Sequence, residues 1–299
     1  METKGIKTVI IVLLAAANIF FVFNITLLNL RMRNIPAEMI ENAAAILRER
    51  RIYVDAGTIS ARRPVNYIYE GLHSYENYYE IAGSFSGASD EEVRIGVIRI
   101  PGVTAFNVGE FKFRFEEHMQ VEIVRADYWD GDAGQQAELL AGHTGFSGSD
   151  ENRAARIIRD FLRAYPRQDA RTGFRIIGMK QDGTRDKVLI NQTVGDILIS
   201  SHTAFVIISG GEVKYFSGRW YFGPFVASHR EPLLDSVNIL FRSLEQDGET
   251  LAGARLESME KQYTVMPYGG RFYLVPAWVL SFDDERRFSY DMITGNRNH

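Results

Sequence analysis

The amino-acid sequence predicts an α+β protein, in which an N-terminal transmembrane helix precedes an ectodomain of antiparallel sheets with packed helices, arranged as two related domains. Three observations support this fold class. Residues 8–30 form one long uncharged apolar run, three later segments repeat apolar residues with the helical period, and the segments between them alternate like strands.

The predicted transmembrane anchor is the run at 8–30. Its 23 residues carry no charge. As a helix the run extends roughly 35 Å, enough to cross a hydrocarbon core of about 30 Å. A cleaved signal peptide is the competing interpretation, but the small residues at 15–17 lie mid-run rather than at its end. Two lysines precede the run and two arginines follow it, so the positive-inside rule gives almost no indication of the orientation. We expect a single-pass protein of the cell membrane, with a cytoplasmic N-terminus and its bulk extracytoplasmic.

Three amphipathic helices are predicted after the anchor, each with one apolar face. The first covers 36–51, where Pro36 suits the first helical turn. The second covers 151–165 and ends before Pro166, which cannot continue a helix. The third covers 232–246, where six apolar residues follow the 3.6-residue period.

Strands are predicted between these helices, because polar and apolar residues alternate there. They are 93–100, 111–116, 121–124, 174–179, 188–191, 204–209, 212–216, 254–266, 272–282 and 288–293. Gly210 and Gly211 predict a tight hairpin between two of them. The loop at 130–149 is rich in Gly, Ala and Asp, which is typical of a domain boundary or of a mobile loop. We expect a stub and anchor at 1–33 and extracytoplasmic domains at 34–145 and 146–299.

The composition of the chain excludes several classes of partner and of site. Beyond residue 33 the chain has 30 Lys and Arg against 37 Asp and Glu, a net charge of about −7. This acidic balance argues against a nucleic-acid partner, which requires a basic face. The sequence has no cysteine, so it has no disulfide framework, no thiolate nucleophile and no cysteine zinc site.

A family resemblance appears in the last 70 residues. The segment LLDSVNILFRSLEQDG, followed by RFYLVPAWVLSFDDERRFSYDMITGN, resembles the C-terminal unit of YycI-type regulatory proteins, which is itself similar to PepSY modules. The start of the chain also resembles that family, with two lysines, an apolar run and then a helix. The resemblance implies a membrane-bound regulator of a WalK-type sensor histidine kinase of Gram-positive bacteria. This kinase senses the cell wall, and the regulator works together with a YycH-like paralogue.

Catalytic motifs are not found. The six histidines form no H-E-x-x-H or other close ligand pair. The serine-containing turns at 83–87 and 145–148 do not match G-x-S-x-G, and no phosphate-binding glycine loop is present. We therefore expect no enzyme activity, no cofactor and no metal site. The sequence does not indicate whether the protein binds a small molecule.

Two sets of residues are candidates for partner binding. In the anchor, Asn18 and Asn29 fall within about 20° of one helical face, a face of the kind that pairs helices in a bilayer. It also carries Ala15, Val22 and Ile25. In the ectodomain, Trp220, Tyr221 and Phe222 begin the densest aromatic cluster, which is either core or exposed recognition surface.

The function expected is that of a non-catalytic, membrane-spanning regulator of a sensor histidine kinase, acting through transmembrane and ectodomain contacts. Two alternatives are a PepSY-like extracytoplasmic protease inhibitor or chaperone, and a membrane-anchored wall hydrolase. An enzyme requires a cleft with convergent polar groups, whereas an inhibitor requires an exposed strand edge or groove.

Overall fold

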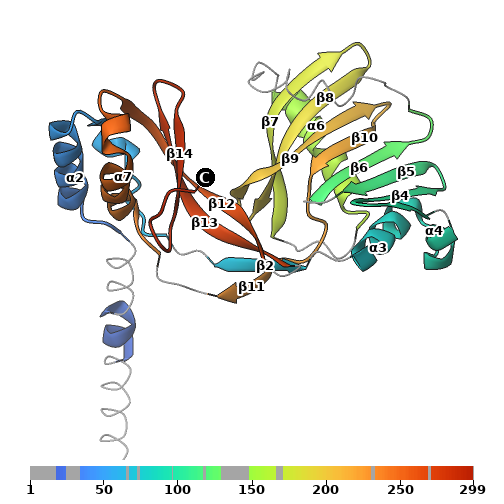
Figure 1. Ribbon diagram of the computed structural model, residues 1–299, viewed down its shortest axis with the longest axis horizontal. Helices are drawn as coiled ribbons and strands as arrows, with labels where there is room; N and C mark the ends of the chain where they lie inside the picture. The colour runs from blue at the N-terminus through green and yellow to red at the C-terminus, as the bar shows by residue number, and fades with distance from the viewer. Residues whose placement is uncertain are drawn as a thin grey trace, which may run out of the picture. The chain divides into compact units, whose positions relative to one another are not determined.

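The computed structural model describes residues 18–24, 34–64, 67–72, 75–95, 97–116, 119–128, 148–165, 171–229, 233–268 and 271–298. The chain forms two compact units (Figure 1). Unit 1 comprises 1–66, 231–260 and 277–299, and unit 2 comprises 67–230 and 261–276. Two long strands, β12 (Arg255–Tyr268) and β13 (Arg271–Phe282), contribute one part to each unit.

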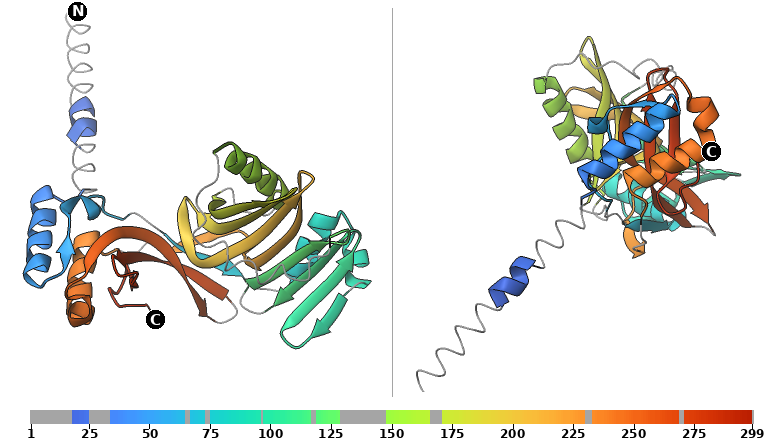
Figure 2. Two further views of the ribbon diagram at one scale, coloured as in Figure 1. Left: turned by 90° about the horizontal axis from the view of Figure 1, so that it is seen from above. Right: turned by 90° about the vertical axis from the view of Figure 1, so that its left-hand side faces the viewer.

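Unit 1 places two helices on strands from both ends of the chain. Beyond residue 33 its described elements are α2 (Ala37–Glu49), β1 (Tyr53–Val54), η1 (Ala56–Thr58), α7 (Ser236–Leu251), β14 (Arg287–Asp291) and its shares of β12 and β13. β1 pairs in parallel with β12, and β14 pairs antiparallel with β13. The helices α2 and α7 pack side by side (Figure 2). The apolar faces of the helices and strands meet in one buried cluster, which includes Leu47, Leu240, Trp278 and Leu280.

The last residues of unit 1 close over α7 through a buried carboxylate. Asp247 accepts a hydrogen bond from the Tyr290 hydroxyl at 2.7 Å and one from Arg297 Nη1 at 2.7 Å. Burial and the neighbouring Asp247 carboxylate raise the pKa of Tyr290, which therefore stays a proton donor. Arg297 also lies over the Phe288 ring, 4.4 Å from its centroid. These contacts hold the C-terminal residues on the helix.

Among its described residues, unit 2 has eight antiparallel strands in the order β7-β8-β9-β10-β6-β5-β4-β3. Their bounds are β3 Val97–Ile100, β4 Val103–Val108, β5 Phe111–Glu116, β6 Gln120–Arg125, β7 Thr172–Asp182, β8 Arg185–Val194, β9 Ile197–Ser209 and β10 Glu212–Arg219. The helices described in this unit are α3 (Tyr75–Ser86), α4 (Asp90–Ile95) and α6 (Gly148–Leu162). Phe85 of α3 and Phe161 of α6 pack ring to ring at 4.7 Å within the buried cluster of this unit.

A second group of strands belongs to unit 2. It consists of β2 (Ile68–Leu72), β11 (Val226–His229) and the unit 2 parts of β12 and β13, in the order β11-β2-β13-β12. β12 joins this group to β9 by parallel pairing, with Tyr263 opposite Ile199. The sheet is therefore mixed, although most of its pairs are antiparallel.

The predicted fold class requires correction. Strands outweigh helices among the described residues, and parallel as well as antiparallel pairs occur in the sheet, so the protein is mainly β rather than α+β with purely antiparallel sheets. The division into two units also differs from the expected domains 34–145 and 146–299, because unit 1 takes segments from both ends of the chain. The expected boundary loop at 130–149 lies almost entirely outside the described residues.

The predicted anchor and membrane localisation also require correction. Within the described chain no helix has both the length and the apolar character needed to cross a membrane. Of the run at 8–30, only 18–24 is described; it is helical.

Most of the individual elements predicted from periodicity are confirmed. The three helices correspond to α2, α6 and α7, with ends shifted by a few residues. The strand 111–116 matches β5 in full, and the Gly210–Gly211 hairpin joins β9 to β10 with φ of 62° and 81°. The strand predicted at 93–100 is wrong in its first half, which lies in α4. Ser89 and Glu92 cap that helix reciprocally, with Ser89 N donating to Glu92 Oε2 at 2.8 Å.

Candidate functional site

The candidate site is an apolar groove on one face of the β11-β2-β13-β12 strands. The register aligns Glu70 of β2 with Val226 of β11 on one side and with Tyr273 of β13 on the other. Because side chains alternate along a strand, these three residues share one face, and their neighbours Tyr69 and Leu274 share the other. The first face is open and the second is buried.

The buried face is an aromatic cluster that fixes the sheet from behind. Its rings include Tyr69, Tyr263, Tyr221, Phe225 and Phe272. Tyr69 meets Tyr263 edge to face at 5.6 Å, and Tyr221 meets Phe272 in the same way at 4.6 Å. Burial raises the pKa of Tyr263, so its hydroxyl stays neutral. Edge-to-face pairs of this kind each add about 0.5–1.5 kcal/mol beyond area burial, so the cluster presents the open face as a rigid platform.

Gly71 makes the close packing of this cluster possible. It lies opposite Phe272 in the register, and the Phe272 ring covers it. A Cβ atom at Gly71 would lie 2.8 Å from Phe272 Cε2 and closer still to Cζ. Glycine at this position therefore lets the Phe272 ring lie flat on β2.

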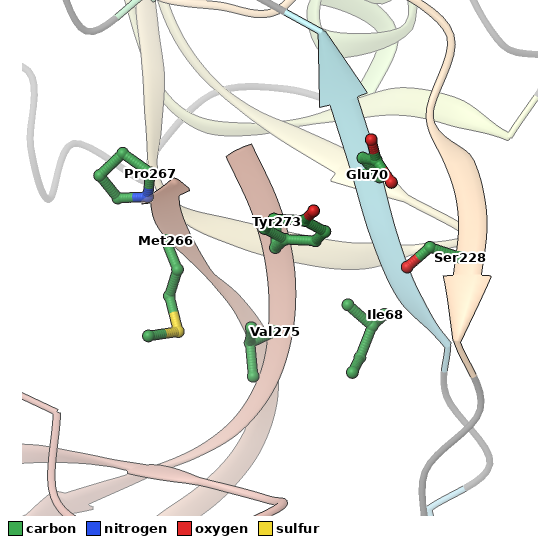
Figure 3. Close-up of a pocket in the computed structure, with 7 residues that line it drawn as sticks. All are labelled: Ile68, Glu70, Ser228, Met266, Pro267, Tyr273 and Val275. Atoms are coloured by element: carbon green, nitrogen blue, oxygen red, sulfur yellow. The ribbon is translucent and has the colours of Figure 1, made fainter. Parts of the chain in front are cut away.

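The open face forms a pocket of about 510 Å³, within the range of ordinary ligand sites. Figure 3 shows the side chains of seven residues around it, coming from four strands. They are Ile68, Glu70, Ser228, Met266, Pro267, Tyr273 and Val275. Met266 is 49% exposed, and Val226 beside the pocket is 60% exposed. Apolar side chains left in water at a concave sheet face favour binding of an apolar partner.

A few polar groups border the pocket. Glu70 forms an ion pair with Arg271, so its charge is already compensated. The hydroxyl groups of Ser228 and Tyr273 form no hydrogen bond with any other described residue. Strand β11 hydrogen-bonds only to β2 within the described chain, so its outer edge offers backbone groups to a ligand. The groove can thus combine apolar contact with backbone pairing.

The aromatic residues singled out from the sequence belong to the core. Trp220, Tyr221 and Phe222 are at most 5% exposed, which resolves the two alternatives in favour of burial. Trp220 and Phe222 lie in the large cluster of unit 2, whereas Tyr221 lies in the cluster behind the groove. These residues therefore support the sheet from within the core and are not part of its open face.

A buried polar clamp holds this aromatic segment in place. Gln192 donates from Nε2 to the Tyr221 carbonyl at 2.8 Å and accepts at Oε1 from the Tyr221 N–H at 3.1 Å. His202 Nδ1 lies 2.8 Å from the same Oε1. Burial, with a smaller effect of Arg219, lowers the pKa of His202 to about 3. The imidazole is therefore neutral and donates from Nδ1, which satisfies the acceptor without a buried charge.

The other predicted site residues are not brought to the groove. Ala15, Ile25 and Asn29 lie outside the described residues. Asn18 and Val22 lie in the short helical stretch 18–24, and both are exposed. Among the residues that the structure describes, no group of three His, Asp or Glu side chains is placed to hold a metal ion.

Comparison with known proteins leaves the chain without an assigned family. No protein-family profile matches it, and no curated protein matches it. Among solved structures, the fold is similar to that of an uncharacterized protein from Eubacterium rectale, with 9% identity and a TM-score of 0.48. That similarity covers 83% of this chain and 91% of the other. A likeness this weak carries no functional argument.

Proposed function

We propose that this protein is a non-catalytic regulatory protein whose unit 2 groove binds an extended apolar segment of a protein partner. The observation that carries the proposal is the contrast between the two faces of one sheet. The back face is packed with aromatic rings, and the front face leaves Met266 and Val226 in water. Since the platform is fixed without a ligand, little ordering free energy is lost when a partner binds.

An extended peptide fits this surface better than a compact ligand does. The open edge of β11 adjoins the pocket and presents backbone groups that a further strand can pair with. Side chains of such a strand alternate, so every second one points into the pocket lined by Ile68, Met266 and Val275. The hydroxyls of Ser228 and Tyr273 can accept or donate hydrogen bonds at the border.

The resemblance of 233–296 to YycI-type proteins suggests the class of partner. It favours a WalK-type sensor histidine kinase, or a YycH-like paralogue that acts with it, as the source of the bound segment. Regulation then depends on occupancy of the groove, and no membrane-spanning contact is part of this proposal.

A second candidate is a PepSY-like protease inhibitor or chaperone. The open edge of β11 beside the pocket favours it, because proteases and their inhibitors commonly engage each other through extended strands. Under this alternative the groove binds a segment of the protease or of its precursor, and addition of the purified protein slows cleavage of a peptide substrate.

The test is site-specific photo-crosslinking from the groove. A photo-reactive phenylalanine analogue replaces Ser228 in cells that express the protein, and the crosslinked peptide is identified by mass spectrometry. We expect a peptide of the sensor kinase or of the paralogue, with apolar residues at alternate positions. A peptide from a protease supports the second candidate.

A matched pair of variants controls the experiment. Met266→Asp places a charge in the groove, and Met39→Asp places the same charge at a methionine on α2 that is 42% exposed. Burying an unpaired carboxylate against apolar groups is costly, so only Met266→Asp should abolish the crosslink. Equal crosslinking in both variants would show that the groove is not the binding site.

A further inference from the structure

A second surface of unit 2 has features that the groove does not explain. Strand β3 ends the sheet order and hydrogen-bonds only to β4 among the described strands. Ile98 and Ile100 pair with Ala105 and Val103, on the face of β3 away from the core. These isoleucines are 54% and 59% exposed. An edge strand that shows two large apolar side chains in water is a ready template for another strand.

The opposite face of β3 carries positive charge. Arg99 lies between Ile98 and Ile100 and therefore points to the other face, where it donates a hydrogen bond to the Tyr79 hydroxyl. Arg94, at the end of α4, lies over the same ring, with Cζ 5.4 Å from the ring centroid against 5.6 Å for Arg99. Neither guanidinium forms an ion pair with a described carboxylate. Two arginines thus gather on one tyrosine, and no described carboxylate pairs with either of them.

We infer that β3 receives an extended segment of a partner protein in which acidic and apolar side chains alternate. A strand paired with β3 places every second side chain beside Ile98 and Ile100 and the intervening ones beside Arg99 and Arg94. Carboxylates at the intervening positions complete charge-assisted hydrogen bonds with the two guanidinium groups. The inference rests on β3 and the neighbouring Arg94 of α4, and it does not depend on the unit 2 groove.

A second copy of this chain fits the edge less well than such a partner. Antiparallel pairing of two β3 strands that aligns Ile98 with Ile100 also aligns Arg99 with Arg99. Like charges directly opposite one another destabilise a strand pair. Charge complementarity therefore favours an acidic partner over self-association.

The test uses the full-length protein and a designed probe peptide. The probe is a fluorescein-labelled Thr-Glu-Val-Glu-Val-Glu-Val-Thr peptide, and its binding is followed by fluorescence anisotropy at low and at physiological salt. A peptide with Lys in place of every Glu tests charge. A third peptide keeps all side chains but carries N-methyl groups on alternate backbone nitrogens, which prevents strand pairing.

We expect the glutamate probe to bind, and both the lysine and the N-methylated probes to bind at least about fivefold more weakly. Binding of the glutamate probe should weaken as salt is raised. If the N-methylated probe binds as well as its parent, the contact is not strand addition. If the lysine probe binds as well as the glutamate probe, the arginines play no part. Either result overturns the inference.

Substitutions at and near β3 test whether the probe binds there. The double variant Arg94→Ala and Arg99→Ala should weaken binding of the glutamate probe about fivefold, because two exposed charge pairs are lost. Arg163→Ala is the matched control, since this exposed arginine on the chain just after α6 pairs with Asp160 away from β3. Ile98→Thr with Ile100→Thr should also weaken binding while the charges stay. Unchanged binding in the arginine double variant would place the probe elsewhere.

Discussion

Replacement of Gly71 by alanine tests whether the back of the groove is packed as tightly as the structure indicates. The added Cβ would lie 2.8 Å from Phe272 Cε2 and closer still to Cζ, whereas carbon atoms pack at about 3.5–4.0 Å. The ring must therefore shift by roughly an ångström. That shift disturbs the contacts of Phe272 with Tyr221 at 4.6 Å and with Phe225 at 6.1 Å.

The expected cost follows from overpacking. Forcing an extra methyl group into a filled core costs about 1–3 kcal/mol, and three interlocked rings favour the upper half of that range. Phe272→Ala alone should cost about 3–5 kcal/mol, because it empties a buried site. In the Phe272→Ala background, Gly71→Ala has room and should be neutral or stabilising by about 0.5 kcal/mol, since alanine restricts the unfolded chain more than glycine.

The measurement is a double-mutant cycle. Urea unfolding of the wild type, the two single variants and the double variant gives four free energies, and the coupling between the sites should be about 2–3 kcal/mol. The reasoning is refuted if Gly71→Ala costs the same amount with and without the Phe272 ring. In that case the cost comes from the backbone at 71 rather than from the ring that covers it.

Three further predictions address the rest of the fold. Lowering the pH from 7 to 5 should destabilise unit 2 by about 2 kcal/mol, because the pKa of His202 is about 3 in the folded chain and about 6.5 in the unfolded chain. The stabilisation is therefore complete above pH 6.5 and is lost as the pH falls toward 3. Chemical unfolding of His202→Gln should lack this component of the pH dependence. Asp247→Ala should cost about 2–3 kcal/mol in thermal or urea unfolding, more than Tyr290→Phe at about 1 kcal/mol, because removal of the carboxylate takes an acceptor from both the Tyr290 hydroxyl and Arg297. The opposite ranking would contradict the role given to the Asp247 carboxylate. Gly218→Ala should lower the free energy of unfolding by at least about 3 kcal/mol, since Gly218 has φ of 152° and a Cβ there would lie 2.5 Å from Ala204 Cα. An unchanged free energy of unfolding would show that β9 and β10 separate readily.

Local patterns predicted the parts of the fold that depend on neighbouring residues. The alternation at Phe111, Phe113 and Phe115 was sufficient for β5, because all three side chains reach the same side and two are fully buried. The two glycines at 210–211 were sufficient for a hairpin, because both need positive φ. By contrast, 93–100 is apolar enough for a strand, and the capping pair Ser89 and Glu92 is the local signal that indicated a helix before it.

The apolar run at 8–30 predicted the anchor from hydropathy alone. Hydropathy measures the free energy of transfer from water, and most of the run lies outside the described residues. The exposed apolar residues at 19–23 explain why the run predicted an anchor, although no spanning helix is found among the described residues.

The groove could not be predicted from sequence because it depends on pairing between distant segments. Glu70 and Tyr273 lie side by side only through the register of β2 with β13, some 200 residues apart. The alternation of side-chain character at Ile68, Tyr69 and Glu70 only weakly predicts β2. It does not indicate which strand pairs with β2. The aromatic cluster at 220–222 drew attention to the correct region, but its rings lie behind the sheet rather than on its open face.

The topology of unit 1 also bears on how the chain is synthesised. β1 pairs with β12 between Tyr53 and Arg255, and α2 shares its core with strands near residue 280. The apolar face of α2 therefore emerges from the ribosome long before its packing partners exist. At about 5–20 residues per second, the delay is on the order of 10–40 seconds. During that interval the meander β3–β6, whose pairs are all local, can already form. Ile40, Ala43 and Leu47 therefore remain without their native packing partners for most of translation.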